Sequence, residues 1–149
     1  MIKSITKKFP KGVEIVVGAV IENSKGQILL TKSPKWHNKW VLPGGHVNPG
    51  ETILEGSSRE IQEEVGVKLK PVIIINFGEL INSKDFHRPA HFIYFNIFCI
   101  TLGNRVKIDN REITDYLWIE PKKSLKMNLT KIHKKFITDY LKYKKSSKK

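Results

Sequence analysis

Two periodicities of apolar residues alternate along the chain of 149 residues. Short runs of β-branched and aliphatic side chains, separated by residues typical of turns, predict strands, and the first two read as a hairpin. The predicted strands are residues 14–23, 26–32, 40–42, 68–81, 91–101 and 116–120. The segment 33–45 is rich in Pro, Gly and Trp and therefore predicts an ordered loop around the third of these strands.

A different period appears in residues 52–65, which predict a helix. At about 100° per residue the apolar side chains fall in one arc and the acidic ones in another. The apolar arc, which we expect to be buried, holds Leu54, Ile61 and Val65, and the exposed acidic arc holds Glu60, Glu63 and Glu64. Glu51 and Thr52 suit the first turn of this helix, and Gly66 suits its end.

The end of the chain also predicts a helix. From Leu129 the apolar residues recur at helical spacing, so we expect a basic C-terminal helix and tail at about 129–149 that packs on the body with its lysines outward. The order strand, strand, helix, strands, helix predicts an α+β or mixed-sheet layered fold. The sequence has no internal repeat and no linker, so residues 1–149 are expected to form a single domain.

Charge is distributed unevenly along the sequence. The formal net charge is +13, and residues 121–149 contribute +10 of it, with eleven lysines against Asp139. Such a segment can bind nucleic acid weakly, but a lysine-rich helix face is more often simply solvated, and we favour the solvated interpretation. Cys99 is the only cysteine, and no apolar run is long enough to span a membrane, so we expect a cytoplasmic protein without a membrane partner.

The acidic arc is the candidate site for chemistry. Carboxylates at spacing i, i+3 and i+4 repel one another, so a compensating hard cation such as Mg²⁺ or Mn²⁺ is expected near Glu60, Glu63 and Glu64. Gly56 lies one turn earlier on the same face, where the missing side chain is expected to leave room for a ligand. The alternative is an exposed set of glutamates that favours the helix and binds nothing.

The spacing of the whole stretch argues against that alternative. Residues 45–67 follow the pattern G-x5-E-x7-R-E-U-x-E-E-x-G-U, where U is aliphatic, and this pattern resembles the Nudix box of the Nudix hydrolase superfamily. The flanking segments "KWVLPGGHVNPGE" and "REITDYLWIEPKKSL" are also similar to the family. The resemblance covers about residues 13–127 and leaves the final basic helix unmatched.

The resemblance implies the Nudix fold, a mixed β-sheet sandwiched between α-helices, and metal-dependent hydrolysis of a nucleoside diphosphate linked to another group. Glu60, Glu63 and Glu64 match the metal-binding acids, one of which serves as general base. Arg59 and Glu51 match a supporting salt bridge. Gly44 or Gly45 is expected to offer a carbonyl to the metal. Glu112 matches an additional acidic ligand, with Asp109 and Asp115 as its rivals.

The substrate is less clearly indicated. Residues typical of relatives that hydrolyse ADP-ribose, dinucleoside polyphosphates or coenzyme A are absent, which favours a nucleoside triphosphate or a nucleotide sugar. Trp36, Phe86 and Tyr94 are among the aromatic residues that could stack on a base, whereas His37 and His133 are expected at the surface. An RNA 5′-end pyrophosphohydrolase and a non-catalytic nucleotide-binding module are the alternatives, and many relatives form homodimers.

Overall fold

A mixed β-sheet organises the molecule, for which the computed structural model describes residues 8–148. The strands lie in the order β3-β2-β1-β6-β5, while β4 pairs with β1 and β7 pairs with β2. β1 and β6 are parallel, and the other paired strands are antiparallel. The strands are β1 Val13–Glu22, β2 Ile28–Lys32, β3 Trp40–Val41, β4 Gly44–His46, β5 Lys70–Ile81, β6 His91–Ile100 and β7 Asp115–Ile119. The helices are the 3₁₀ turn η1 Pro34–Trp36, α2 Ile53–Val65, α3 Pro121–Ser124 and α4 Lys131–Ser147.

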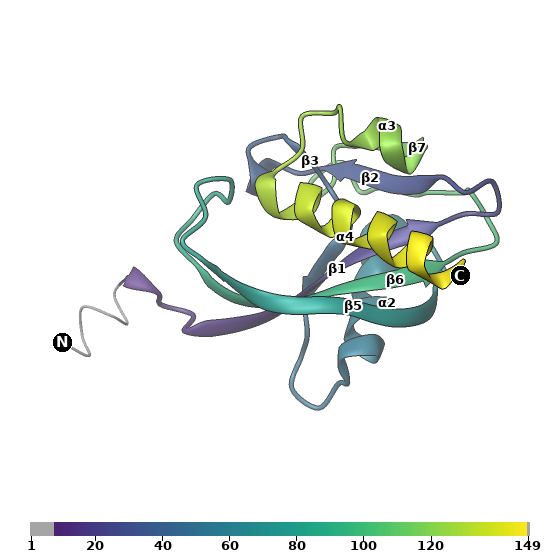
Figure 1. Cartoon of the computed structure of the whole chain (residues 1–149). Coiled ribbons are helices and arrows are strands. Elements are labelled where there is room, and N and C mark those ends of the chain that lie inside the picture. The colour runs from purple at the N-terminus through teal and green to yellow at the C-terminus, as the bar shows by residue number, and fades with distance from the viewer. Residues whose placement is uncertain (1–7, 149) are drawn as a thin grey trace.

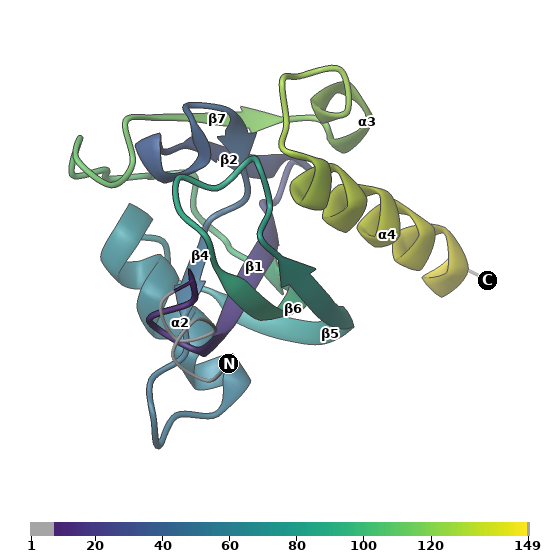
Figure 2. The same ribbon diagram turned by 90° about the vertical axis from the view of Figure 1, so that its left-hand side faces the viewer.

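The sheet lies between α2 on one side and α4 on the other (Figures 1 and 2). Each helix buries apolar side chains against its own face of the sheet, so there are two main apolar cores. The prediction of a mixed sheet between helices is therefore confirmed. Within the described part of the chain, none of the helices is long and apolar enough to cross a membrane.

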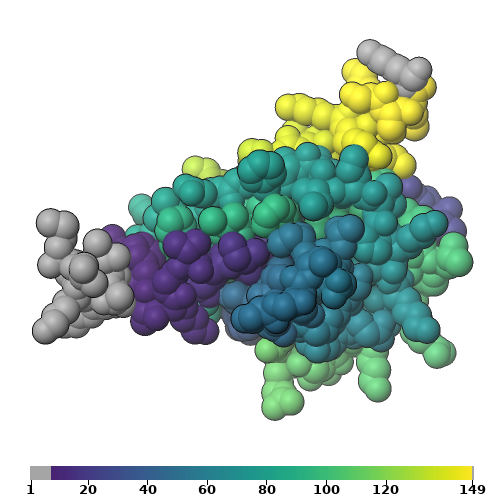
Figure 3. Space-filling model, turned by 90° about the horizontal axis from the view of Figure 1, so that it is seen from below, coloured from purple at the N-terminus to yellow at the C-terminus, as the bar shows by residue number. Residues whose placement is uncertain are grey.

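Helix α2 begins and ends at residues that the sequence indicates. The Thr52 hydroxyl accepts a hydrogen bond from the Glu55 N–H at 3.1 Å, and Gly66 ends the helix with a positive φ of 69°. Ile61 and Val65 are fully buried against the sheet. The same position was predicted for Leu54, and this is wrong because Leu54 is 40% exposed. The first turn of α2 and the loop before it extend beyond the sheet (Figure 1), and this loop lies at the surface (Figure 3).

Helix α4 packs its apolar stripe on the opposite face of the sheet. Phe136, Ile137 and Tyr140 are almost completely buried there. The prediction that His133 lies at the surface is wrong, since this residue is only 5% exposed. It precedes Phe136 by three residues and so shares the buried side of the helix, where the Trp36 ring contacts it edge-on at 5.0 Å between centroids.

Candidate active site

A salt bridge fixes the loop that leads into α2. The Arg59 guanidinium donates two hydrogen bonds to the Glu51 carboxylate, at 2.7 and 3.0 Å, and a third to the carbonyl oxygen of His46 at 3.0 Å. Glu51 also accepts a hydrogen bond from the Asn48 N–H at 2.8 Å. The hydrogen bonds from Arg59 lower the pKa of Glu51. These contacts tie α2 to β4 and to the intervening loop. The pair of Arg59 and Glu51 therefore fixes the position of α2.

Glu60 and Glu64 extend from α2 towards the strand β4. A Cβ built on Gly45 would lie 2.6 Å from the Glu60 carboxyl carbon, so a larger residue at this position would displace the Glu60 side chain. The backbone of Gly44 lies near the Glu64 carboxyl group and opposes the rise in its pKa that burial causes. Gly45 therefore allows close contact between the Glu60 carboxylate and the backbone of β4.

The electrostatics of these two carboxylates favour bound positive charge. Burial, together with the negative charges of Glu60 and Glu112, raises the pKa of Glu64 to about 8. Burial is also the main cause that raises the pKa of Glu60, while Arg59 opposes the shift. A carboxylate that is partly desolvated next to other carboxylates is stabilised by a proton or by a metal cation. The pair can therefore serve as a cation site.

Glu63, the third glutamate of the Nudix-box pattern, lies at the surface. Glu63 is 59% exposed, and its carboxylate accepts a hydrogen bond from Arg59 at 3.1 Å. Within residues 8–148, no three His, Cys, Asp or Glu side chains are gathered closely enough to hold a metal ion as they stand. The donors nevertheless fit a hard divalent cation, because Glu60 and Glu64 offer carboxylate oxygens whose charge is only partly compensated.

Among the three candidates for an additional acid, only Glu112 lines the same cavity as Glu60 and Glu64. The Asp109 carboxylate instead accepts hydrogen bonds from three N–H groups of its own loop. Asp115 lies in β7 opposite Lys32. The structure thus brings Glu112, and neither rival, to the box carboxylates.

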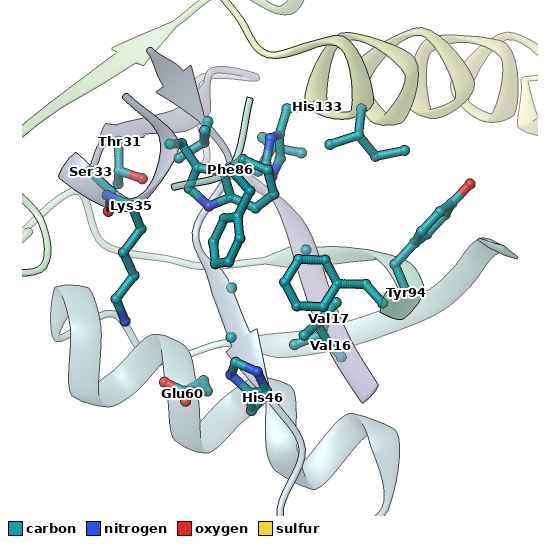
Figure 4. Close-up of a pocket in the computed structure, with 18 of the residues that line it drawn as sticks. Val16, Val17, Thr31, Ser33, Lys35, His46, Glu60, Phe86, Tyr94 and His133 are labelled. Atoms are coloured by element: carbon teal, nitrogen blue, oxygen red, sulfur yellow. Dashed lines mark hydrogen bonds between the residues drawn. The ribbon is translucent and has the colours of Figure 1, made fainter. Parts of the chain in front are cut away.

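The cavity has a volume of about 350 Å³, within the range of small-molecule sites (Figure 4). At one end are Glu60, Glu64 and Glu112, with Lys35 near them; its ammonium group lies 3.8 Å from the Glu112 carboxylate. At the other end the lining is mainly aromatic. The aromatic end is formed by Trp36, Phe86, Phe92, Tyr94, His133 and Phe136.

One network of charged side chains beside the cavity was not found from the sequence. Glu14, in β1, is almost completely buried and accepts two hydrogen bonds from Arg88, at 2.7 and 2.9 Å. Its carboxylate also lies 2.7 Å from His46 Nε2. Arg88 and His46 both line the cavity. A lone acid at the start of an apolar strand was the only signal, and its partners lie 32 and 74 residues away.

Gly56 does not have the role that the sequence suggested. A Cβ on Gly56 would lie 3.2 Å from both methyl groups of Val47, so the space beside it is already filled by protein. The prediction of room for a ligand there is therefore wrong. Gly45, which contacts Glu60, is the glycine that shapes the site.

A mixed sheet between two helices, with a glutamate-rich helix beside a cavity, is the arrangement of a Nudix hydrolase. The NUDIX domain family matches residues 13–140, and the chain belongs to this family. The match continues well into α4, beyond the limit at residue 127 that the sequence motifs suggested. Nudix hydrolases generally use divalent metal ions.

Individual proteins support this assignment. Nucleoside triphosphatase NudI of Escherichia coli O17:K52:H18 (strain UMN026 / ExPEC) is 34% identical over 116 residues, which cover 71% of this chain and 81% of that protein. The m7GpppN-mRNA hydrolase NUDT17 of Xenopus laevis is 41% identical over 125 residues, which cover 74% of this chain but only 42% of that protein. The crystal structure of the MutT protein from Methanosarcina mazei Go1 superposes with a TM-score of 0.73 and 29% identity, covering 92% of this chain and 96% of the other. These relatives support hydrolysis of nucleotide pyrophosphate linkages.

Proposed function

We propose that this protein hydrolyses the diphosphate linkage of a nucleoside triphosphate or a nucleotide sugar with the help of Mg²⁺ or Mn²⁺. One observation carries the proposal: a single cavity joins the carboxylates of Glu60, Glu64 and Glu112 to an aromatic end. A nucleotide has matching parts, a charged phosphate chain and a flat base. The similarity to a nucleoside triphosphatase over 71% of the chain supports the same substrate class.

The proposed metal ligands are Glu60, Glu63 and Glu64, with the Gly44 carbonyl and Glu112. A bound divalent ion would neutralise the carboxylates, polarise phosphoryl oxygens and lower the pKa of the attacking water. One of the box glutamates would accept the proton of that water as it attacks phosphorus. Arg59 and Glu51 would hold the helix in place. Lys35 lies near Glu112 at the carboxylate end of the cavity. Its positive charge there would attract the phosphate chain.

The test measures release of phosphate or pyrophosphate from nucleoside triphosphates, nucleotide sugars and ADP-ribose, with Mg²⁺, with Mn²⁺ and with a chelator. Metal-dependent turnover should fall by orders of magnitude in Glu64→Gln while the melting temperature stays near that of the wild type. Glu112→Gln should also reduce turnover, whereas its rival Asp115→Asn should not. Wild-type turnover in Glu64→Gln would refute the assigned role of this residue.

A second candidate substrate is the 5′ end of an RNA. It is favoured by the 41% identity to an mRNA cap hydrolase and by α4, which contributes Ile132 and His133 to the cavity and carries six lysines. Capped and triphosphorylated RNA therefore belong in the same panel. If RNA is the substrate, its kcat/KM should fall steeply with salt and with removal of residues 142–149, while turnover of mononucleotides should not.

We further propose that residues 1–149 form one Nudix domain that works in the cytoplasm. The packing of α4 on the sheet supports a single unit. Cys99 is a buried free cysteine, and burial raises the pKa of its thiol to about 12, which suits a reducing compartment because no disulfide is required. Fractionation of cells that express the full chain tests the location.

A further inference from the structure

The aromatic end of the cavity differs chemically from the carboxylate end. Trp36 and Phe86 form one ring pair with centroids 4.6 Å apart, and Tyr94 and Phe136 form a second with centroids 5.0 Å apart. These four side chains carry no charge, and the Arg88 guanidinium, 5.1 Å from the centre of the Phe86 ring, is already paired with the Glu14 carboxylate. Such surroundings suit a flat, neutral group and disfavour a phosphate. The ring of His133 extends from α4 towards this space (Figure 4).

His133 is neutral in this position. The side chain is almost completely buried, and burial lowers its pKa to about 3. A neutral imidazole has one N–H donor and one acceptor nitrogen, and the hydrogen bond at one nitrogen determines the role of the other. The neighbours of His133 therefore decide what it presents to the cavity.

Thr130 determines which nitrogen of the His133 imidazole carries the hydrogen. Its hydroxyl oxygen lies 2.5 Å from His133 Nδ1 and also accepts a hydrogen bond from the His133 backbone N–H at 3.3 Å. Thr130 is fully buried, so its hydroxyl hydrogen needs a partner, and Nδ1 is the one within reach. If Nδ1 carried the proton, the hydroxyl hydrogen would remain unpaired. Nδ1 is therefore the acceptor, and Nε2 carries the hydrogen.

The Nε2–H group is available to a ligand. Nδ1 faces Thr130, so Nε2 lies on the other side of the ring, and among the hydrogen bonds formed by residues 8–148 none involves it. Asp85 does not compete for it, because its carboxylate accepts hydrogen bonds from the Lys39 ammonium at 2.7 Å and the Lys131 N–H at 3.0 Å. The aromatic end thus contains one oriented donor beside stacking surfaces.

We propose that His133 determines base specificity by donating a hydrogen bond from Nε2 to an exocyclic oxygen of the base. The proposal rests on the function proposed above, since it places the base of the nucleotide at the aromatic end. A base with an oxo group at this position, such as hypoxanthine, guanine or uracil, accepts the bond. Adenine or cytosine places an amino group there, so that two donors face each other and one remains unpaired. Thr130 is a positioning residue, since it keeps the imidazole from switching tautomers.

The experiment compares substrates that differ in this group, ITP with ATP and UTP with CTP, by their kcat/KM values. The wild type should prefer the oxo base of each pair by roughly tenfold or more. His133→Phe keeps an aromatic ring but has no hydrogen-bond donor. In this variant the ratio of kcat/KM between the two bases of each pair should approach one. Thr130→Val should weaken the preference, while Thr130→Ser, which retains a hydroxyl, should preserve it. Melting temperatures identify any variant that fails to fold.

A second measurement separates this proposal from the proposed hydrolysis. IMP and AMP are added to metal-free protein, and the rise in melting temperature is compared, since a ligand that binds the folded state raises it. A larger rise with IMP in the wild type and equal rises in His133→Phe would support the base contact even if no triphosphate were hydrolysed. Equal preferences in the wild type and His133→Phe, with normal triphosphate turnover, would overturn the role of His133 and leave the hydrolase assignment intact.

Discussion

The buried carboxylate of Glu14 offers a direct test of how the cavity wall is held. Replacing it by glutamine in Glu14→Gln keeps the size of the side chain and removes the charge that faces Arg88 and His46. The hydrogen bonds from Arg88 are the main cause that lowers the pKa of Glu14 from 4.5 to about 2. At about 1.4 kcal/mol per unit, this shift corresponds to roughly 3 kcal/mol in the free energy of unfolding at neutral pH. The side chain is only 5% exposed, so solvent screens the interaction little.

The sign of the pH dependence follows from the direction of the shift. Glu14 has a lower pKa in the folded than in the unfolded state, so its charge stabilises the fold above the unfolded value of 4.5. This contribution decreases as the pH falls from 4.5 through about 2. The difference in unfolding free energy between the wild type and Glu14→Gln should therefore fall from about 3 kcal/mol at pH 7 to about 1 kcal/mol at pH 3.

Urea unfolding followed by tryptophan fluorescence measures this difference at each pH. Glu120→Gln is the matched control, because Glu120 is 58% exposed and its carboxylate lies 3.8 Å from the ammonium group of Lys123. Removing that surface pair should change stability by less than about 1 kcal/mol. A loss below about 1 kcal/mol in Glu14→Gln at pH 7, or a loss that does not change with pH, would refute the reasoning about the buried network.

Two further substitutions test the site and the fold. Gly45→Ala should lower turnover at least about tenfold, because the added methyl group would displace the Glu60 carboxylate. The melting temperature should change little. Gly103→Ala is the control, because a Cβ at that position would have no atom within 4 Å. Ile61→Ala should reduce the free energy of unfolding by about 2–5 kcal/mol, as expected for a fully buried side chain, whereas Leu54→Ala should cost less than about 1 kcal/mol by urea titration. Equal losses for the two would contradict the exposed position of Leu54.

The arrangement of the carboxylate end of the cavity could be predicted from the sequence because it is local. Thr52 and Gly66 mark the ends of α2, and the spacing of the glutamates between them fixes which side chains share a face. Periodicity alone could not show where the sheet stops, and Leu54 was misplaced for that reason. It also could not show that Val47 fills the space beside Gly56, since that contact depends on the path of the preceding loop.

The other half of the cavity depends on contacts between distant segments. His133 was predicted at the surface because histidine and its lysine neighbours are polar, yet it is buried by Trp36, which lies almost a hundred residues earlier. Glu14 has a comparable relation to Arg88, 74 residues away. Neither pair leaves a spacing pattern in the sequence, so only the folded structure reveals that these residues belong to one cavity.

This difference between the two ends has a consequence for function within the family. Under the proposed function, the carboxylate end needs a helix of fixed spacing, because several charges would have to meet the same metal and phosphate groups. The aromatic end needs only a flat space and a hydrogen-bonding group of the correct polarity, and residues from separate segments supply these. A change at His133 or Thr130 can therefore alter which base is accepted without disturbing Glu60 or Glu64. On this reasoning, substitutions at the aromatic end should change the ratio of kcat/KM between bases, whereas substitutions in α2 should lower kcat for all substrates alike.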